Sequence, residues 1–279
     1  MHFSLPVLSP GPAEFAFACN RCGNCCSNQS GYVWVEENEI DRLAAALGMD
    51  AANFTKRFVK NVGGRLSLVE QNGKCALLNG KNDCTVYNSR PKQCQQFPFW
   101  PSVLAGGEDY KNARDLCPGI LEVPTKAARG RAYVELREFY LRVDVKIRAK
   151  NPICELSGKC CDFPAYGHKL FATILETDFA AEYGPPASES AGAGEREDWC
   201  AFYHGSRCHA REARPLACRI YFCDPATTGA LADLHEELLL ELRELERRHV
   251  YPSGYGDFVE LLPARRNAIT LFNESRRES

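Results

Sequence analysis

The feature that most constrains this chain is a run of cysteines near its amino terminus. The stretch FACNRCGNCCSNQSGY contains Cys19, Cys22, Cys25 and Cys26. A hydrophobic core does not need so many thiols in so short a span, and two adjacent cysteines make poor disulfide partners. Cys-x-x-Cys spacing lets one loop bring several sulfurs to a metal at low entropic cost, as in zinc knuckles and iron–sulfur loops. The run therefore predicts a metal site.

The chain as a whole favours metal over disulfides. It has 15 cysteines, an odd number, in 279 residues. The first residues, MHFSLPVLSPGPAEFAFA, lack a basic region and hold three prolines, so they do not resemble a signal peptide. No apolar run is long enough to span a membrane. We therefore expect a cytoplasmic protein with reduced thiols and no membrane partner.

The charge balance bears on the choice of partner. The chain has 34 Lys and Arg against 36 Asp and Glu, and neither half is a basic block. Nucleic-acid-binding proteins carry an excess of positive charge. We therefore expect no nucleic acid partner, whereas a redox or substrate protein partner remains open.

The cysteines repeat along the chain, which indicates an internal duplication. The offsets of six and seven residues from Cys19 to Cys25 and Cys26 recur at Cys154, Cys160 and Cys161. An interval of ten residues also recurs, and in each copy an Arg-Pro pair begins four residues before its second cysteine. The members of this second repeat are Cys84 and Cys94 with Arg90-Pro91, and Cys208 and Cys218 with Arg214-Pro215.

The two copies differ at several positions. Ser157 stands where the second copy would match Cys22, and Cys117 and Cys223 each have no counterpart in the other half. A histidine from the second half, His168, His204 or His209, is a candidate nitrogen ligand there, although an ordinary hydrogen-bonded role is the more common one. All fifteen thiols are candidate metal ligands: Cys19, Cys22, Cys25, Cys26, Cys75, Cys84, Cys94, Cys117, Cys154, Cys160, Cys161, Cys200, Cys208, Cys218 and Cys223.

Other side chains near these thiols have supporting roles in this interpretation. Successive residues usually point in different directions, so we expect each vicinal pair to contact two irons of one cluster, to serve two centres, or to divide into a ligand and a buried thiol. Arg90 and Arg214 are candidates to donate hydrogen bonds to cluster sulfides or thiolates from outside the ligand shell, or to stabilise turns. Five aromatic residues are expected to shield the metal from water, namely Trp34, Phe97, Phe99, Trp100 and Trp199.

The pattern between the cysteines predicts an α+β fold in two small, loop-rich, metal-stabilised domains. We expect a first domain over 1–125, a connecting helix over 126–150, and a second domain over 151–279. Predicted elements in the first domain are a helix ending near Gly48, a helix opened by Asp50, and a hairpin around Asn72-Gly73 that carries Cys75. A leucine stripe at helical spacing predicts a covering helix in the second domain, using Leu231, Leu234, Leu238, Leu242 and Leu245.

The motif CNRCGNCC, followed by DCTVYNSRPKQCQQFP, resembles the CxxCxxCC cysteine-cluster family, also called YkgJ-type, a zinc- or iron-chelating domain. A degenerate second match runs through KCCDF and WCAFYHGSRCHAREARPLACRIYFC. The resemblance implies a small cysteine-bound metal domain, and some longer relatives, flagellin lysine methylases, join this pattern to methyl transfer.

We expect iron–sulfur clusters of the 4Fe-4S type in both halves, in a redox or cluster-dependent module. The alternatives are a zinc-stabilised interaction protein and a cluster-dependent transferase.

Overall fold

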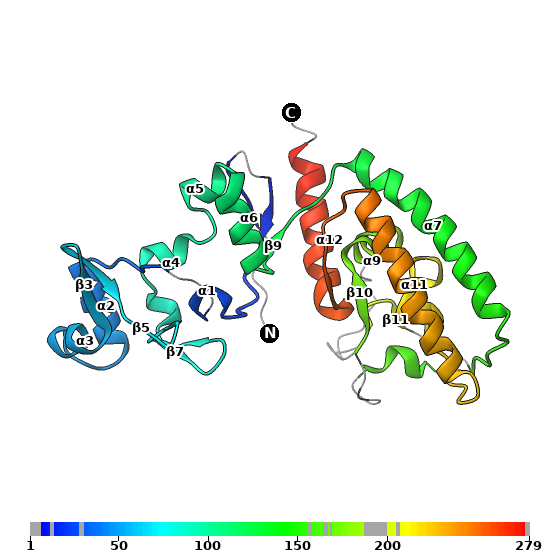
Figure 1. Cartoon of the computed structure of the whole chain (residues 1–279), viewed down its shortest axis with the longest axis horizontal. Helices are drawn as coiled ribbons and strands as arrows, with labels where there is room; N and C mark the ends of the chain where they lie inside the picture. Colours follow the sequence, from blue (N-terminus) through cyan, green and yellow to red (C-terminus); the bar gives the residue numbers. More distant parts are fainter. Residues whose placement is uncertain are drawn as a thin grey trace. The chain divides into compact units, whose positions relative to one another are not determined.

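The computed structural model of the protein describes residues 7–11, 14–27, 31–155, 158–163, 167, 169–186, 200–204 and 207–276. The chain divides into two compact units, Met1–Leu121 and Glu122–Ser279, which are followed by colour along the sequence in Figure 1. Both units mix helices with short antiparallel strands, so the fold is α+β as predicted. Within the described residues, no helix is both long enough and apolar enough to cross a membrane.

The first unit is built from short elements joined by tight turns. Its strands form one three-stranded sheet, in the order β1-β2-β9, and three hairpins, β3-β4, β5-β6 and β7-β8. The elements are β1 (Val7–Leu8), β2 (Ala16–Phe17), α1 (Asn24–Ser27), α2 (Glu37–Ala46), α3 (Ala51–Phe58), β3 (Val59–Val62), β4 (Arg65–Leu68), β5 (Glu70–Gln71), β6 (Lys74–Cys75), β7 (Leu78–Asn79), β8 (Asp83–Cys84), the 3₁₀ turn η1 (Tyr87–Ser89), α4 (Lys92–Gln96), α5 (Pro101–Leu104), α6 (Gly107–Leu116) and β9 (Ile120–Leu121).

Local sequence signals explain several of these elements. The side chain of Asp50 accepts a hydrogen bond from the backbone N–H of Asn53 at 2.8 Å and caps α3, as predicted. Asn72 and Gly73 both have positive φ, of 53° and 74°, and form the tight turn between β5 and β6. Such values are typical of a type I′ turn, which matches the twist of a hairpin. The predicted hairpin is therefore confirmed, and Cys75 lies on its second strand.

The first unit has two small apolar cores. One joins α2 and α3 to the hairpins, with Leu43 and Phe54 fully buried. The other gathers around Phe15, which stacks on Phe99 and Tyr110. Divided cores of this size give a domain little hydrophobic stabilisation, and small domains of this kind commonly depend on cross-links or metals.

The second unit has one continuous core enclosed by long helices. The helix α7 follows the boundary between the units and contributes Leu136, Phe139 and Val143 to this core. Strands β10 and β13 pair antiparallel, as do β11 and β12. The elements are α7 (Lys126–Arg148), the 3₁₀ turn η2 (Lys159–Cys161), β10 (Phe171–Thr173), α9 (Ile174–Tyr183), β11 (Tyr203–His204), β12 (Arg207–Cys208), the 3₁₀ turn η3 (Arg211–Ala213), α10 (Leu216–Ile220), α11 (Thr228–Arg248), β13 (Tyr255–Asp257) and α12 (Phe258–Ser275).

The leucine stripe has the packing role predicted for it, because all five of its leucines are buried on α11. A network of buried charges supports α9 and α12 in the same unit. The guanidinium of Arg265 binds both carboxylate oxygens of Asp178 at 2.6 Å, and Tyr251 donates to Asp178 at 2.8 Å. Since each buried charge has a partner, this network fixes how α12 lies against α9.

Candidate metal centre

All eight cysteines of the first unit line one cavity with a volume of about 380 Å³. They come from segments spread over about a hundred residues, namely the loop after β2, the helices α1 and α4, the hairpins, and the residue that follows α6. The lining thiols are those of Cys19, Cys22, Cys25, Cys26, Cys75, Cys84, Cys94 and Cys117.

The adjacent cysteines of α1 point into this cavity together. Gly23 has φ of 79°, and its carbonyl accepts a hydrogen bond from the N–H of Cys26 at 2.9 Å. In this turn the sulfurs of Cys25 and Cys26 lie 3.9 Å apart. Two thiolates on one tetrahedral zinc ion, each about 2.3 Å from the metal, would be about 3.8 Å apart. The two sulfurs therefore lie closer together than successive residues usually place them. Whether they contact two irons of one cluster, serve two centres, or divide into a ligand and a buried thiol stays a prediction.

The turn that carries this pair leaves no room for a larger residue at position 23. A Cβ atom on Gly23 would lie 2.4 Å from the carbonyl oxygen of Lys81, in the β7-β8 hairpin. The backbone of the cysteine run therefore packs directly against the hairpin that carries Cys84.

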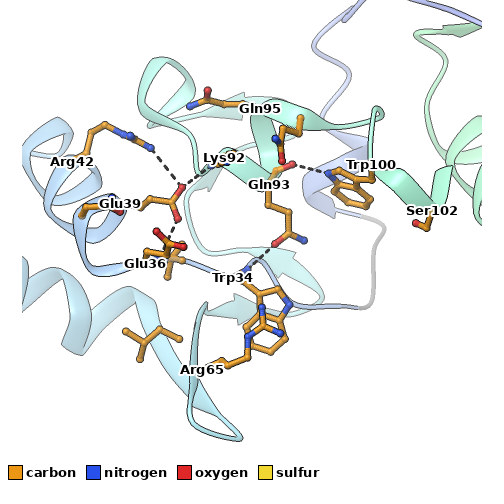
Figure 2. A pocket seen from close by; sticks show the side chains of 14 residues that line it. Trp34, Glu36, Glu39, Arg42, Arg65, Lys92, Gln93, Gln95, Trp100 and Ser102 are labelled. Atoms are coloured by element: carbon orange, nitrogen blue, oxygen red, sulfur yellow. Dashed lines mark hydrogen bonds and ion pairs between the residues drawn. The ribbon is translucent and has the colours of Figure 1, made fainter. Parts of the chain in front are cut away.

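Glu39 holds the helix that carries Cys94. Its carboxylate accepts hydrogen bonds from the backbone N–H of Lys92, at 2.7 Å, and of Glu36, at 3.0 Å. Figure 2 shows this carboxylate between α2 and the first turn of α4, with Arg42 on its outer side. Sequence reasoning missed this contact, although Glu39 stands at the third position of α2, where a capping box places a glutamate.

Gln93, next to Cys94, ties α4 to neighbouring segments. Its side-chain oxygen accepts from the N–H of Trp34 at 2.9 Å, and its carbonyl accepts from the Trp100 indole at 2.9 Å (Figure 2). Trp100, Phe97 and Phe99 all pack in the core around Phe15, and the first two also line the cysteine cavity; that they shield a metal from water stays a prediction. Trp34 lies instead in the open pocket of Figure 2, about 1050 Å³ in volume, and Trp199 lies outside the described residues.

Burial and charge act against each other at the thiols of the cavity. Burial raises the pKa of Cys75 and Cys84, and raises those of Cys94 and Cys117 to about 12. A hydrogen bond from the Cys26 thiol lowers the pKa of Cys25 to about 7, with a smaller contribution from Arg90. A cavity of this kind disfavours free thiolates and so favours a cation that would neutralise them.

Arg90 is placed to act on the thiols from beside the cavity. It is one of the lining residues, and its guanidinium lies 3.8 Å from the centre of the Tyr87 ring. Its Nε donates to the carbonyl of Tyr87 at 2.8 Å, and the Tyr87 hydroxyl is 3.9 Å from the sulfur of Cys19. Arg90 thus stabilises the turn and places a positive charge beside the thiols, whereas its donation of hydrogen bonds to cluster sulfides or thiolates stays a prediction.

In the second unit, five of the seven cysteines gather. The sulfur of Cys161 lies 3.9 Å from that of Cys160, its thiol also interacts with those of Cys200 and Cys208, and Cys218 interacts electrostatically with three of these four. Interaction with the Cys161 thiol lowers the pKa of Cys160 to about 7 and that of Cys208 to about 6. Of the other two predicted ligands, Cys154 is exposed and Cys223 is half-buried.

The other predicted residues of the second unit are placed as follows. Arg214 acts electrostatically on Cys160 and Cys208, as Arg90 does on Cys25 in the first unit. His209 is half-buried, and its Nε2 lies 3.4 Å from Nε of Arg207. Ser157 and His168 lie outside the described residues, as does the side chain of His204.

The donor set of the first unit fits a metal that prefers sulfur. Thiolates select zinc, copper(I) and iron–sulfur clusters over hard cations. Among the described residues, no three His, Cys, Asp or Glu side chains have the spacing of a single-ion site. The eight thiols line one cavity, and thiolates are the ligands that zinc and iron–sulfur sites share.

Comparison with known proteins agrees with this donor set. Residues 18–118 match the model of the CxxCxxCC family, whose description is "Putative zinc- or iron-chelating domain". The matched segment begins just before Cys19 and ends just after Cys117, so it holds all eight thiols of the cavity. No solved structure shows a significant match to the chain.

Proposed function

We propose that the first unit, which belongs to the CxxCxxCC family of zinc- or iron-chelating domains over residues 18–118, binds an iron–sulfur cluster of the 4Fe-4S type and acts as a redox module. One observation carries the proposal, namely the cavity of about 380 Å³ lined by eight thiols. When bound, such a cluster supplies reversible one-electron transfer to a partner protein or a substrate.

The residues around the cavity support an anionic group of this kind. A 4Fe-4S cluster takes four thiolates, so eight thiols exceed what one cluster requires. Arg21 and Arg90 supply positive charge at the wall, and apolar side chains such as Leu77 and Phe97 keep water from much of the lining. Hydrogen bonding and positive charge beside the sulfurs make a cluster easier to reduce, and burial makes it harder.

The setting proposed for this module is the reducing environment of the cytoplasm, where thiols stay available to metal. The first unit has two small cores, so metal binding would contribute directly to its folding free energy.

A zinc-stabilised interaction domain is the second candidate, and one distance favours it. The separation of 3.9 Å between the sulfurs of Cys25 and Cys26 is close to that of two thiolates on one zinc ion. In this case the metal would have no redox role and would only hold the hairpins and α4 together.

Anaerobic purification followed by iron, zinc and acid-labile sulfide analysis separates the two candidates. We expect iron and sulfide in comparable amounts, and a visible absorption that bleaches on reduction. Stoichiometric zinc, with no iron after anaerobic reconstitution, would reject the redox module and leave the interaction domain. Replacing Cys84 and Cys94 together by serine should abolish the signal of the first unit.

A further inference from the structure

The second unit repeats the turn that carries the vicinal thiols of the first. Gly158 has φ of 73°, and its carbonyl accepts from the N–H of Cys161 at 2.9 Å, as Gly23 accepts from Cys26 at the same distance. The sulfurs of Cys160 and Cys161 are 3.9 Å apart, again as in the first unit. Both turns have the sequence Gly-x-Cys-Cys, and the first lies within residues 18–118, which match the family model.

The glutamate contact is repeated as well. Glu176 is the third residue of α9, and its carboxylate accepts from the backbone N–H of Thr173 at 3.0 Å and of Leu216 at 2.6 Å. Leu216 is the first residue of α10 and lies two positions before Cys218, just as Lys92 begins α4 and lies two positions before Cys94. In both units a glutamate at the start of one helix therefore holds the start of a cysteine-bearing helix.

The turn that precedes the cysteine-bearing helix is the third feature that the two units share. Arg214 follows the 3₁₀ turn η3, and its Nε donates to the carbonyl of Arg211 at 3.1 Å. Arg90 follows η1 and donates to Tyr87 across the same three-residue step, at 2.8 Å. In both units a two-stranded hairpin carrying a cysteine, β7-β8 or β11-β12, precedes the turn.

These repeated structures bring five thiols together inside the second unit. Cys161 and Cys200 are each 6% exposed, and the backbone N–H of Cys200 donates to the carbonyl of Cys161 at 3.4 Å. Cys160, Cys208 and Cys218 pack against the same core. Thiols that only fill a core can lie anywhere in it, whereas the ligands of one metal must lie close together.

We infer that the second unit holds a thiolate-bound metal centre of its own, formed by Cys160, Cys161, Cys200, Cys208 and Cys218. In the described residues no three of these sulfurs have the spacing of an ion site. Metal binding would therefore move other thiols of the five toward the close pair of Cys160 and Cys161. The inference rests on contacts within the second unit and holds whether the first unit takes iron or zinc.

The test uses the full chain, purified without oxygen, with iron, zinc and sulfide content measured per chain. After the metal is removed with a chelator, the protein is titrated with Co²⁺, whose thiolate charge-transfer absorption reports sulfur ligation. We expect Cys161→Ser with Cys208→Ser to remove part of the metal and of the absorption. Cys84→Ser with Cys94→Ser should remove the complementary part, because the second unit stays intact in that protein.

Cys154→Ser is the matched control, since it removes an exposed thiol from the same unit and should leave both signals at the wild-type level. A Cys84→Ser, Cys94→Ser protein with no remaining metal and no Co²⁺–thiolate absorption would overturn the second centre and leave the proposed function of the first unit untouched. The Cys154→Ser protein could instead lose as much metal and Co²⁺–thiolate absorption as the Cys161→Ser, Cys208→Ser protein. That result would assign the metal to chelation at the surface and reject the buried site.

Discussion

The carboxylate of Glu39 accepts a hydrogen bond at 2.7 Å from the backbone N–H of Lys92, which lies 53 residues further along the chain. Because Cys94 follows two residues later on the same short helix, this bond fixes where α4 presents its thiol. Glu176 makes the equivalent bond to Leu216 in the second unit. A carboxylate thus sets the position of a candidate thiol ligand in each unit.

Replacing Glu39 by alanine should therefore weaken both the fold and the metal affinity of the first unit. Two backbone N–H groups lose their acceptor, which costs about 1–3 kcal/mol for each such group that stays buried. Urea unfolding and Zn²⁺ titration of the full chain measure the two effects. Arg42→Ala is the control, because Arg42 is exposed and its ion pair with Glu39 contributes about 0–1 kcal/mol. Equal metal affinity in the Glu39→Ala and wild-type proteins would show that α4 is positioned by other contacts.

Gly23→Ala should disrupt the turn that brings Cys25 and Cys26 together. The added Cβ would lie 2.4 Å from a backbone oxygen, and φ of 79° is unfavourable for alanine. Gly48→Ala provides the comparison, since φ there is 66° but no atom lies within 4 Å of the added carbon. The control should cost about 1–2 kcal/mol from backbone strain alone, and the Gly23 variant should cost more and also lose bound metal. Similar metal content in the two variants would contradict the tight packing described for this turn.

The buried carboxyl of Glu246 should make the second unit less stable as the pH rises. Burial raises its pKa from the ordinary 4.5 to about 7, and one of its oxygens has no hydrogen-bond partner among the described residues. Between these values the folded chain holds a proton that the unfolded chain has lost, so the free energy of unfolding falls with increasing pH. The loss across this window is at most about 3 kcal/mol.

Glu246→Gln should remove this loss, and thermal unfolding between pH 4.5 and 8 would show a flatter profile for the variant. A wild-type profile that rises through this range, with the variant unchanged from it, would mean that Glu246 is ionised in the folded state.

Leu238→Ala should destabilise the second unit by about 2–5 kcal/mol, because the side chain is fully buried on α11 and its removal leaves a cavity. Leu240→Ala, on the same helix but 73% exposed, should change the free energy of unfolding by less than about 0.5 kcal/mol. Metal bound to the first unit should be unaffected in both proteins. Differential scanning calorimetry measures the two stabilities, and metal analysis of the same proteins measures the bound metal. Comparable destabilisation by the two substitutions would contradict the packing role of the leucine stripe on α11.

Much of the candidate site could be predicted from the sequence, because cysteine spacing records which thiols must meet. The grouping of Cys75, Cys84 and Cys94 with the amino-terminal run is visible in the structure, although that they bind metal stays a prediction. The start of α3 at Asp50 and the turn at Asn72-Gly73 could be predicted because each depends on residues that are neighbours in sequence.

What could not be predicted depends on contacts distant in sequence. Nothing near Glu39 or Glu176 indicates which N–H on another helix each will bind, even though Thr173-x-x-Glu176 is a recognisable capping box. The short separation of the Cys25 and Cys26 sulfurs could not be predicted either, because the sequence does not indicate how the turn that begins at Gly23 orients the two side chains. Cys154 was paired with Cys19 by spacing alone, and spacing gives no account of its exposure.

The thiols of the first unit are drawn from segments between Cys19 and Cys117, and this spread has a consequence during synthesis. The chain leaves the ribosome from its amino terminus, so the four thiols of the first run emerge long before the hairpins and α6. A metal captured by that run would wait, partly exposed to competing thiols in the cell, until the rest of the cavity has been made. Binding of a metal by the first run would then precede its enclosure by the hairpins and α6. Slower translation would lengthen the interval in which the metal can still be lost or exchanged.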